Sequence, residues 1–192
     1  MDDNLPSWSV RLLREVDAND AQAQRIAGSL TLEQLNWNPR PDAWSAGQCL
    51  EHLCGTTQHY LPRIEEALRN QPNGRVEEIT PGGPSRWFIR TMIDPATSTK
   101  RFSAPGKIVP GSRVDAGIIQ RFRDANQRLR ATIRQAANYD VNRIRFRNPF
   151  LSIIRFTVGS GLVILSSHER RHLLQAERAA AAFPAQAPPS KR

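Results

Sequence analysis

Two of the four histidines in this 192-residue chain, His168 and His172, stand four positions apart in the run His-Glu-Arg-Arg-His. On a helix, that spacing puts both imidazoles on one face, about 40° apart. Two histidines on one face can hold one divalent metal ion, but a stable site needs a third ligand. The third ligand must therefore come from elsewhere in the chain.

The same run satisfies the H-E-x-x-H pattern of zincin metalloproteases, in which the glutamate, here Glu169, is the general base. Zincins take their third ligand from downstream of this pattern. No histidine follows here, Glu177 is the one acidic residue, and Arg178 stands at the metzincin ligand position. We therefore do not expect a protease, and look upstream, where His52 and His59 remain.

His52 lies in a second predicted helix, residues 45–70, which opens on a capping-box pair with Ser45 as the cap and Gln48 three positions later. The apolar side chains of this helix form one stripe, and a separate polar stripe surrounds His52. A lone histidine here would be interpreted as a surface or hydrogen-bonded core residue. Its pairing with the second histidine segment favours a metal ligand. The polar stripe holds Ser45, Gln48, Cys49, Thr56 and His59.

Apolar residues at helical spacing predict an all-α fold, a four-helix bundle, and such bundles build metal sites between facing helices. The last helix is expected to begin between residues 151 and 157, and residues 139–150 are interpreted as a linker across the bundle. The long connection 71–112 contains a short helix at 85–93 and is either a lid over a pocket or an outer insertion. We expect one domain over residues 1–183 and a disordered tail at 184–192. The expected long helices are residues 7–28, 45–70, a third that begins at residue 112 or 114 and ends near 138, and a last one ending near 182.

The net charge of +9 is concentrated in the middle of the chain. Residues 1–85 carry seven Arg and twelve acidic residues, whereas residues 86–147 carry twelve Arg, two Lys and four acidic residues. A nucleic-acid partner would account for clustered arginine, but no nucleic-acid motif or aromatic platform accompanies it. We expect instead a solvated face or a pocket for an anionic small molecule.

The cysteines and the hydropathy indicate the compartment. Cys49 and Cys54 are five positions apart, so on one helix they point about 140° from each other and are expected to be reduced thiols. No apolar run approaches 18 residues and the N-terminus lacks an apolar signal core. We expect a cytoplasmic protein with no membrane partner.

The segment Trp-Ser-Ala-Gly-Gln-Cys-Leu-Glu-His-Leu, which ends at Leu53, resembles the W-S-x-x-(E/Q)-x-(L/I)-x-H-L opening of the second helix in the DinB-like superfamily. The proline-ended segment 32–41 and the pattern His168-x-x-x-His172-x-x-Gln175 match that family too. The resemblance covers about residues 8–182, with the long connection and the basic middle as departures. It implies a DinB-like, YfiT-like bundle that binds a metal through His52, His168 and His172. Members include metal-dependent hydrolases and transferases or isomerases that use bacillithiol or mycothiol.

Three neutral imidazoles leave a divalent ion with open positions, and Zn, Ni and Fe all accept such a site. Around it we expect Glu169 as a candidate general base, Gln48 and Gln175 as partners that orient the imidazoles, and His59 at the mouth of the pocket. Arg86 and Arg90 could hold the carboxylates of a low-molecular-weight thiol. The candidate site residues are His52, His168, His172, Glu169, His59, Arg86, Arg90, Gln48 and Gln175.

These features favour an enzyme, namely a metal-dependent hydrolase or a low-molecular-weight-thiol S-transferase that acts on a small electrophilic substrate. The alternative is a non-catalytic, metal-containing stress-response or binding protein. Pairing into a homodimer stays open, because no interface can be identified in the sequence.

Overall fold

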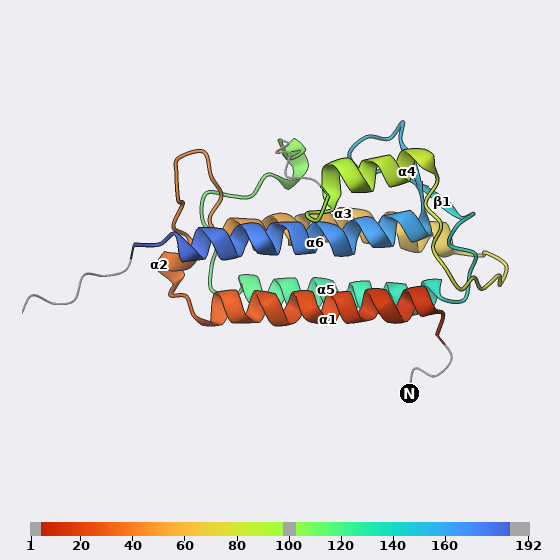
Figure 1. The fold of residues 1–192 in the computed structure, drawn as a ribbon, viewed down its shortest axis with the longest axis horizontal. Coiled ribbons are helices and arrows are strands. Elements are labelled where there is room, and N and C mark those ends of the chain that lie inside the picture. Colours follow the sequence, from red (N-terminus) through yellow and green to blue (C-terminus); the bar gives the residue numbers. More distant parts are fainter. Residues whose placement is uncertain (1–4, 98–102, 185–192) are drawn as a thin grey trace, which may run out of the picture.

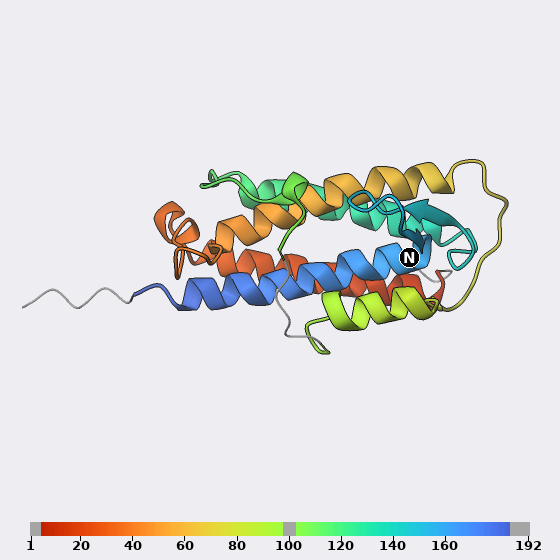
Figure 2. The ribbon, with the colours of Figure 1, turned by 90° about the horizontal axis from the view of Figure 1, so that it is seen from above.

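The four long helices of the chain lie side by side along one axis (Figures 1 and 2). The computed structural model describes residues 5–97 and 103–184, and residues 185–192 of the expected disordered tail lie outside it. Both α3 and α1 pack against α5 and α6, so the order around the bundle is α1, α5, α3, α6. The predicted four-helix bundle is confirmed. Its long helices are α1 (Ser7–Gly28), α3 (Ala46–Leu68), α5 (Ile118–Ala136) and α6 (Val158–Ala181).

Capping residues set the starts of several helices. In α3, the Ser45 hydroxyl accepts from the Gln48 N–H and the Gln48 side chain accepts from the Ser45 N–H, as the capping-box pattern predicted. The same arrangement opens the short helix α2 (Leu32–Leu35), and Thr157 caps α6. The start of the third long helix was predicted too early. The side chain of Asn36 donates to the Val114 carbonyl and accepts from the Val114 N–H, which keeps residue 114 out of the helix, and α5 begins at Ile118.

The segment interpreted as a linker instead forms a β-hairpin, which corrects that prediction. β1 (Arg145–Arg147) pairs antiparallel with β2 (Arg155–Thr157), and Phe146 lies opposite Phe156. Both phenylalanines are buried against the bundle. Close packing on α6 explains a glycine in that helix, because a Cβ at Gly161 would lie 2.6 Å from the Phe146 ring.

The long connection lies along the face formed by α3 and α6. Its helix α4 (Gly83–Phe88) continues into a π-helical turn, η1 (Ile89–Ile93), and lies over α6 (Figure 1). A 3₁₀ turn, η2 (Gly106–Ile108), packs on α3. The ends of these segments are tied to the bundle, since Arg170 donates to Asp94 and Gln48 donates to the Gly111 carbonyl. The connection therefore covers the same helix pair that carries the three histidines.

Part of the charge imbalance along the chain is resolved by ion pairs between helices. Arg130 of α5 pairs with Asp17 and Asp20 of α1, and Arg128 of α5 pairs with Glu65 of α3. The acidic first third and the basic middle of the chain therefore meet at the surface of the bundle, where α5 packs against α1 and α3. Among the described residues, no helix is both long and apolar enough to cross a membrane.

Candidate metal centre

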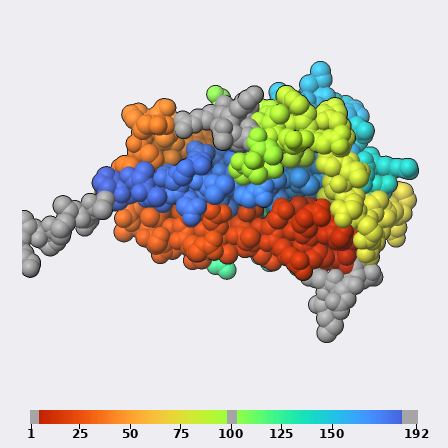
Figure 3. All heavy atoms as spheres, in the orientation of Figure 1, coloured from red at the N-terminus to blue at the C-terminus, as the bar shows by residue number. Residues whose placement is uncertain are grey.

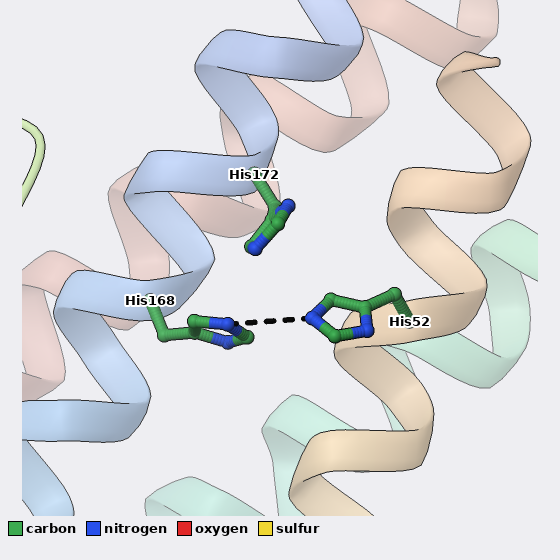
Figure 4. Close-up of side chains that lie close together, drawn as sticks. All are labelled: His52, His168 and His172. Carbon is green, nitrogen blue, oxygen red and sulfur yellow. Dashed lines mark hydrogen bonds between the residues drawn. The ribbon is translucent and has the colours of Figure 1, made fainter. Parts of the chain in front are cut away.

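His52 projects from α3 towards His168 and His172 of the neighbouring helix α6 (Figure 4). The ring centroids of His168 and His172 are 4.5 Å apart, and those of His52 lie 5.0 Å from His168 and 4.5 Å from His172. One ring nitrogen from each residue falls within 4.8 Å of the others. The structure thus brings together the three histidines that the sequence singled out as candidate metal ligands.

The carbonyl group of Ile108 determines how His52 is oriented. The Nδ1–H of His52 donates to the Ile108 oxygen at 2.8 Å. In the neutral ring this leaves the lone pair on Nε2, which lies 3.3 Å from Nε2 of His168. A hydrogen bond of this kind commonly fixes the tautomer of a metal-binding histidine.

The electrostatic surroundings keep all three rings neutral near physiological pH. Burial lowers the pKa of His52 below its usual value, although the bond to Ile108 acts in the opposite direction. Burial, together with the neighbouring histidines and Arg171, holds the pKa of His168 well below 6.5. Burial, then His52 and Arg171, lower that of His172 to about 3, although Gln175 opposes them. Neutral imidazole is the form that binds a metal ion.

Two observations test whether a metal ion fits this cluster. The Nδ1 atoms of His168 and His172 are buried and have no hydrogen-bond partner among the described residues. Tetrahedral coordination with bonds of about 2.0–2.1 Å separates the ligand nitrogens by roughly 3.3–3.4 Å. The 3.3 Å between Nε2 of His52 and Nε2 of His168 matches this spacing, and one nitrogen of each histidine lies within 4.8 Å of the others, so small side-chain movements would complete the geometry. The donor set fits a divalent ion.

The three histidines differ in exposure. His52 is only 3% exposed, whereas His168 and His172 are half-buried. The indole of Trp44 packs against His52, at a centroid distance of 4.8 Å, and against His172 at 5.8 Å. The tryptophan therefore contacts two of the three rings.

Glu169 lies on another face of α6, towards α1 and α5. It is 1% exposed, and its Oε2 accepts from Nδ2 of Asn19 at 2.9 Å and from Nδ2 of Asn126 at 3.4 Å. Burial raises the pKa of this carboxyl to about 8, although both asparagines lower it. These contacts do not bring Glu169 to the three histidines, so its proposed action as a general base stays a prediction without a supporting contact.

The other predicted site residues have varied positions. Gln48 bonds to the Gly111 carbonyl and to Asn38, so it holds the chain that carries Ile108 and does not contact an imidazole directly. Gln175 lies close enough to His172 to raise its pKa. His59 is exposed on α3 and packs edge-on against Phe150, with ring centroids 5.6 Å apart.

Arg86 and Arg90 line a surface depression of about 410 Å³ together with Trp87. Both arginines are exposed. None of the three histidines lines this depression, so binding of a thiol carboxylate by the two arginines stays a prediction.

Sequence reasoning missed the Ile108 carbonyl, the Trp44 indole and the asparagines that bind Glu169. A backbone carbonyl carries no side-chain signal, so Ile108 could not have been found. Asn19 is a buried polar residue on α1, and its position among the apolar residues of that helix was a usable signal. Cys49 and Cys54 are buried free thiols, as expected, and burial raises the pKa of each to about 12.

The fold and the site together define the protein as a helical bundle in which two neighbouring helices bring three histidines together. The chain belongs to the DinB superfamily, whose family model matches residues 15–176. No curated protein and no solved structure matches the chain significantly.

Proposed function

We propose that this protein is a metal-dependent enzyme of the DinB superfamily that activates a small nucleophile, either water or a low-molecular-weight thiol, against a small electrophilic substrate. The observation that supports the proposal most strongly is the convergence of three neutral imidazoles, with the tautomer of His52 set by Ile108. His52, His168 and His172 would hold the ion. When bound, a divalent ion on three imidazoles lowers the pKa of water or of a thiol at its open positions.

Residues around the three histidines orient the imidazoles and affect how a substrate can approach them. Ile108 keeps the lone pair of His52 on Nε2, directed towards His168. Trp44 restrains the rings of His52 and His172, which reduces the movement needed when an ion binds. The partial exposure of His168 and His172 leaves an approach for a substrate of small size.

The thiol in a transferase reaction would be a cosubstrate and not a residue of the chain. Cys49 and Cys54 are buried, and with pKa values near 12 they hold almost no thiolate at neutral pH. A free thiol such as bacillithiol or mycothiol would have to approach where His168 and His172 are partly exposed.

The test is turnover by purified protein loaded with Zn²⁺, Ni²⁺ or Fe²⁺. Consumption of the electrophile monochlorobimane would be measured with and without a low-molecular-weight thiol, and hydrolysis of small activated esters and amides would be measured in parallel. We expect activity that chelation abolishes, that re-addition of metal restores and that His52→Ala lacks. Thiol-dependent consumption would identify a transferase, and thiol-independent hydrolysis would identify a hydrolase.

His59→Ala is the matched control, because it removes an exposed histidine from the same helix. If the protein binds metal with all three histidines intact but catalyses neither reaction, the protein is a non-catalytic metal-binding protein and the proposal fails.

A further inference from the structure

The loop between β1 and β2 exposes two large apolar side chains. Leu151 is 57% exposed and Ile153 is 91% exposed. The loop is held by its own hydrogen bonds, because the N–H groups of Phe150 and Leu151 donate to Oδ1 of Asn148, and the Asn148 N–H donates to the Ile154 carbonyl. Exposure of the two side chains is therefore part of an ordered loop conformation.

The base of the same loop is anchored to α3. Nδ2 of Asn148 donates to the Tyr60 hydroxyl at 3.1 Å, and the Phe150 ring packs against Tyr60 and His59 at centroid distances of 5.8 and 5.6 Å. Phe150 thus turns inward while Leu151 and Ile153 remain in solvent. Figure 3 shows this part of the chain projecting beyond α4 at the top of the molecule.

The strands below the loop present arginine on their outer face. Arg145, Arg147 and Arg155 are exposed, and Arg147 lies directly opposite Arg155 in the strand register. Like charges in directly opposite positions destabilise a strand pair. Residues 141–157 contain four Arg and no Asp or Glu, and the described residues supply no ion pair to these three arginines. An anionic partner would relieve the repulsion.

Helix α4 extends the same kind of surface beside the hairpin. The ring of Phe88 in α4 packs against Phe156 of β2 at 5.3 Å. The preceding residue, Trp87, is 63% exposed, and Arg86 and Arg90 on the same helical segment are exposed too. Tryptophan beside cationic side chains is typical of segments that lie at a membrane–water interface.

We propose that the hairpin of residues 145–157 docks the protein on an anionic lipid surface. Leu151 and Ile153 enter the boundary between headgroups and acyl chains, and Arg147 and Arg155 lie against the lipid phosphates. Reversible binding to a membrane surface combines a small buried apolar area with a cationic patch, and the hairpin supplies both. In this arrangement the protein lies on the membrane surface, and the vesicle experiment below decides between this proposal and the expectation of no membrane partner.

Other occupants of this surface fit less well. A nucleic acid would neutralise the arginines but would leave Leu151 and Ile153 in water, because the phosphate backbone offers no apolar surface. A second copy of the chain would bring arginine against arginine. The lipid surface is the partner that satisfies both the charge and the apolar tip.

The test is co-sedimentation of the full chain with vesicles of phosphatidylcholine alone and of phosphatidylcholine mixed with an equal amount of phosphatidylglycerol. We expect binding to the mixed vesicles only, weakened when the salt is raised well above physiological ionic strength, about 0.15 M. Arg147→Gln/Arg155→Gln should weaken that binding about tenfold or more. Leu151→Ser/Ile153→Ser should weaken it by a similar factor.

The matched control is Arg123→Gln/Arg134→Gln, which removes the same charge from exposed positions of α5 and should change binding by no more than about twofold. All variants lie at exposed positions, so thermal unfolding should show that each folds. The proposal is overturned if the wild type does not bind the mixed vesicles, if it binds neutral vesicles equally well, or if the control loses as much binding as the hairpin variants. Arginine-dependent binding to duplex DNA without vesicle binding would assign the surface to nucleic acid instead.

Discussion

Two polar clusters on different faces of α6 come from one five-residue run and differ in exposure and in their links to other helices. Towards α3, His168 and His172 are half-buried, and their Nδ1 atoms have no partner among the described residues. Towards α1 and α5, Glu169 is sealed, and its Oε2 accepts hydrogen bonds from two asparagines, although its Oε1 and Oδ1 of Asn126 also lack a partner among the described residues. The first cluster is a candidate metal site, and the second is an internal contact between helices.

Within this single run, Glu169 is expected to contribute to stability, whereas His168 and His172 are expected to contribute to metal binding. A buried polar group contributes to one specific packing when its partners are correctly placed, and it is costly when they are removed. Asn19 and Asn126 therefore link α1 and α5 to α6 through Glu169 and fix the rotation of α6 about its axis. That rotation directs His168 and His172 towards α3.

Removing one histidine should have the largest effect on metal binding. Loss of an outer partner of a metal ligand commonly costs 10–100-fold in affinity, so His168→Ala, which removes a ligand, should weaken Zn²⁺ or Ni²⁺ binding by at least about 100-fold. Isothermal titration of the metal into metal-free protein measures this. His59→Ala should bind as the wild type does, and equal losses in both variants would rule out the triad as the binding site.

Removing Glu169 should chiefly affect stability. Glu169→Ala removes one acceptor from each of two buried amides, which keep only the Ser166 carbonyl and Asp20, and it opens a cavity, so we expect a loss of about 2–4 kcal/mol in the free energy of unfolding. Urea denaturation provides the measurement. Glu177→Ala, at an exposed position two turns along α6, should cost less than about 0.5 kcal/mol. A Glu169→Ala protein as stable as the wild type would show that the sealed cluster does not hold the helices together.

The two clusters should also respond oppositely to pH in the metal-free protein. The folded pKa of Glu169, about 8, lies above its usual 4.5, so its contribution to stability is complete below about pH 4.5 and is lost as the pH rises towards 8. The histidine pKa values are lowered, so their contribution is lost as the pH falls below 6.5.

Glu169→Gln removes only the first of these two pH effects. Its stability relative to the wild type should therefore increase between pH 5 and pH 8, as measured by urea denaturation across that range. A constant difference between the two proteins would contradict the raised pKa of Glu169.

A smaller effect is expected from the residue that holds the Ile108 segment. Gln48→Ala removes one of the two bonds that tie Gly111 to α3, the other being its N–H bond to Glu51, and should weaken metal binding about tenfold, because the carbonyl that orients His52 is held less firmly. Gln34→Ala is the control, because Gln34 fills the same capping-box position in α2. If both variants bind metal equally well, the connection does not orient His52.

The smallest effect should come from the other tie between the connection and α6. Arg170→Gln breaks a partly exposed ion pair with Asp94, so we expect a loss of about 0.5–1 kcal/mol in stability. Metal affinity should stay within about twofold of the wild type, because Arg170 has no contact with the three imidazoles among its described hydrogen bonds. A large loss of metal binding would mean that the α4 side of the connection also shapes the site.

The parts of the site that follow from local spacing could be predicted, and those that depend on neighbouring helices could not. The spacing of His168 and His172, the capping box at Ser45 and the resemblance of the His52 segment identified three residues that the structure brings together. Helical spacing predicted the position of Glu169 around the axis of α6 relative to His168. It could not predict that asparagines from α1 and α5 would hydrogen-bond to Glu169. The hairpin was missed because three-residue strands carry too little alternation, and the Ile108 contact is made by backbone.

We infer that His52, His168 and His172 together hold one divalent ion. The decisive experiment is anomalous diffraction at the zinc edge, from crystals of the full chain grown with Zn²⁺. We expect one strong peak at about 2.0–2.1 Å from a ring nitrogen of each of the three histidines. A peak bound by only one or two of them, or strong peaks at other residues with none between α3 and α6, would contradict it.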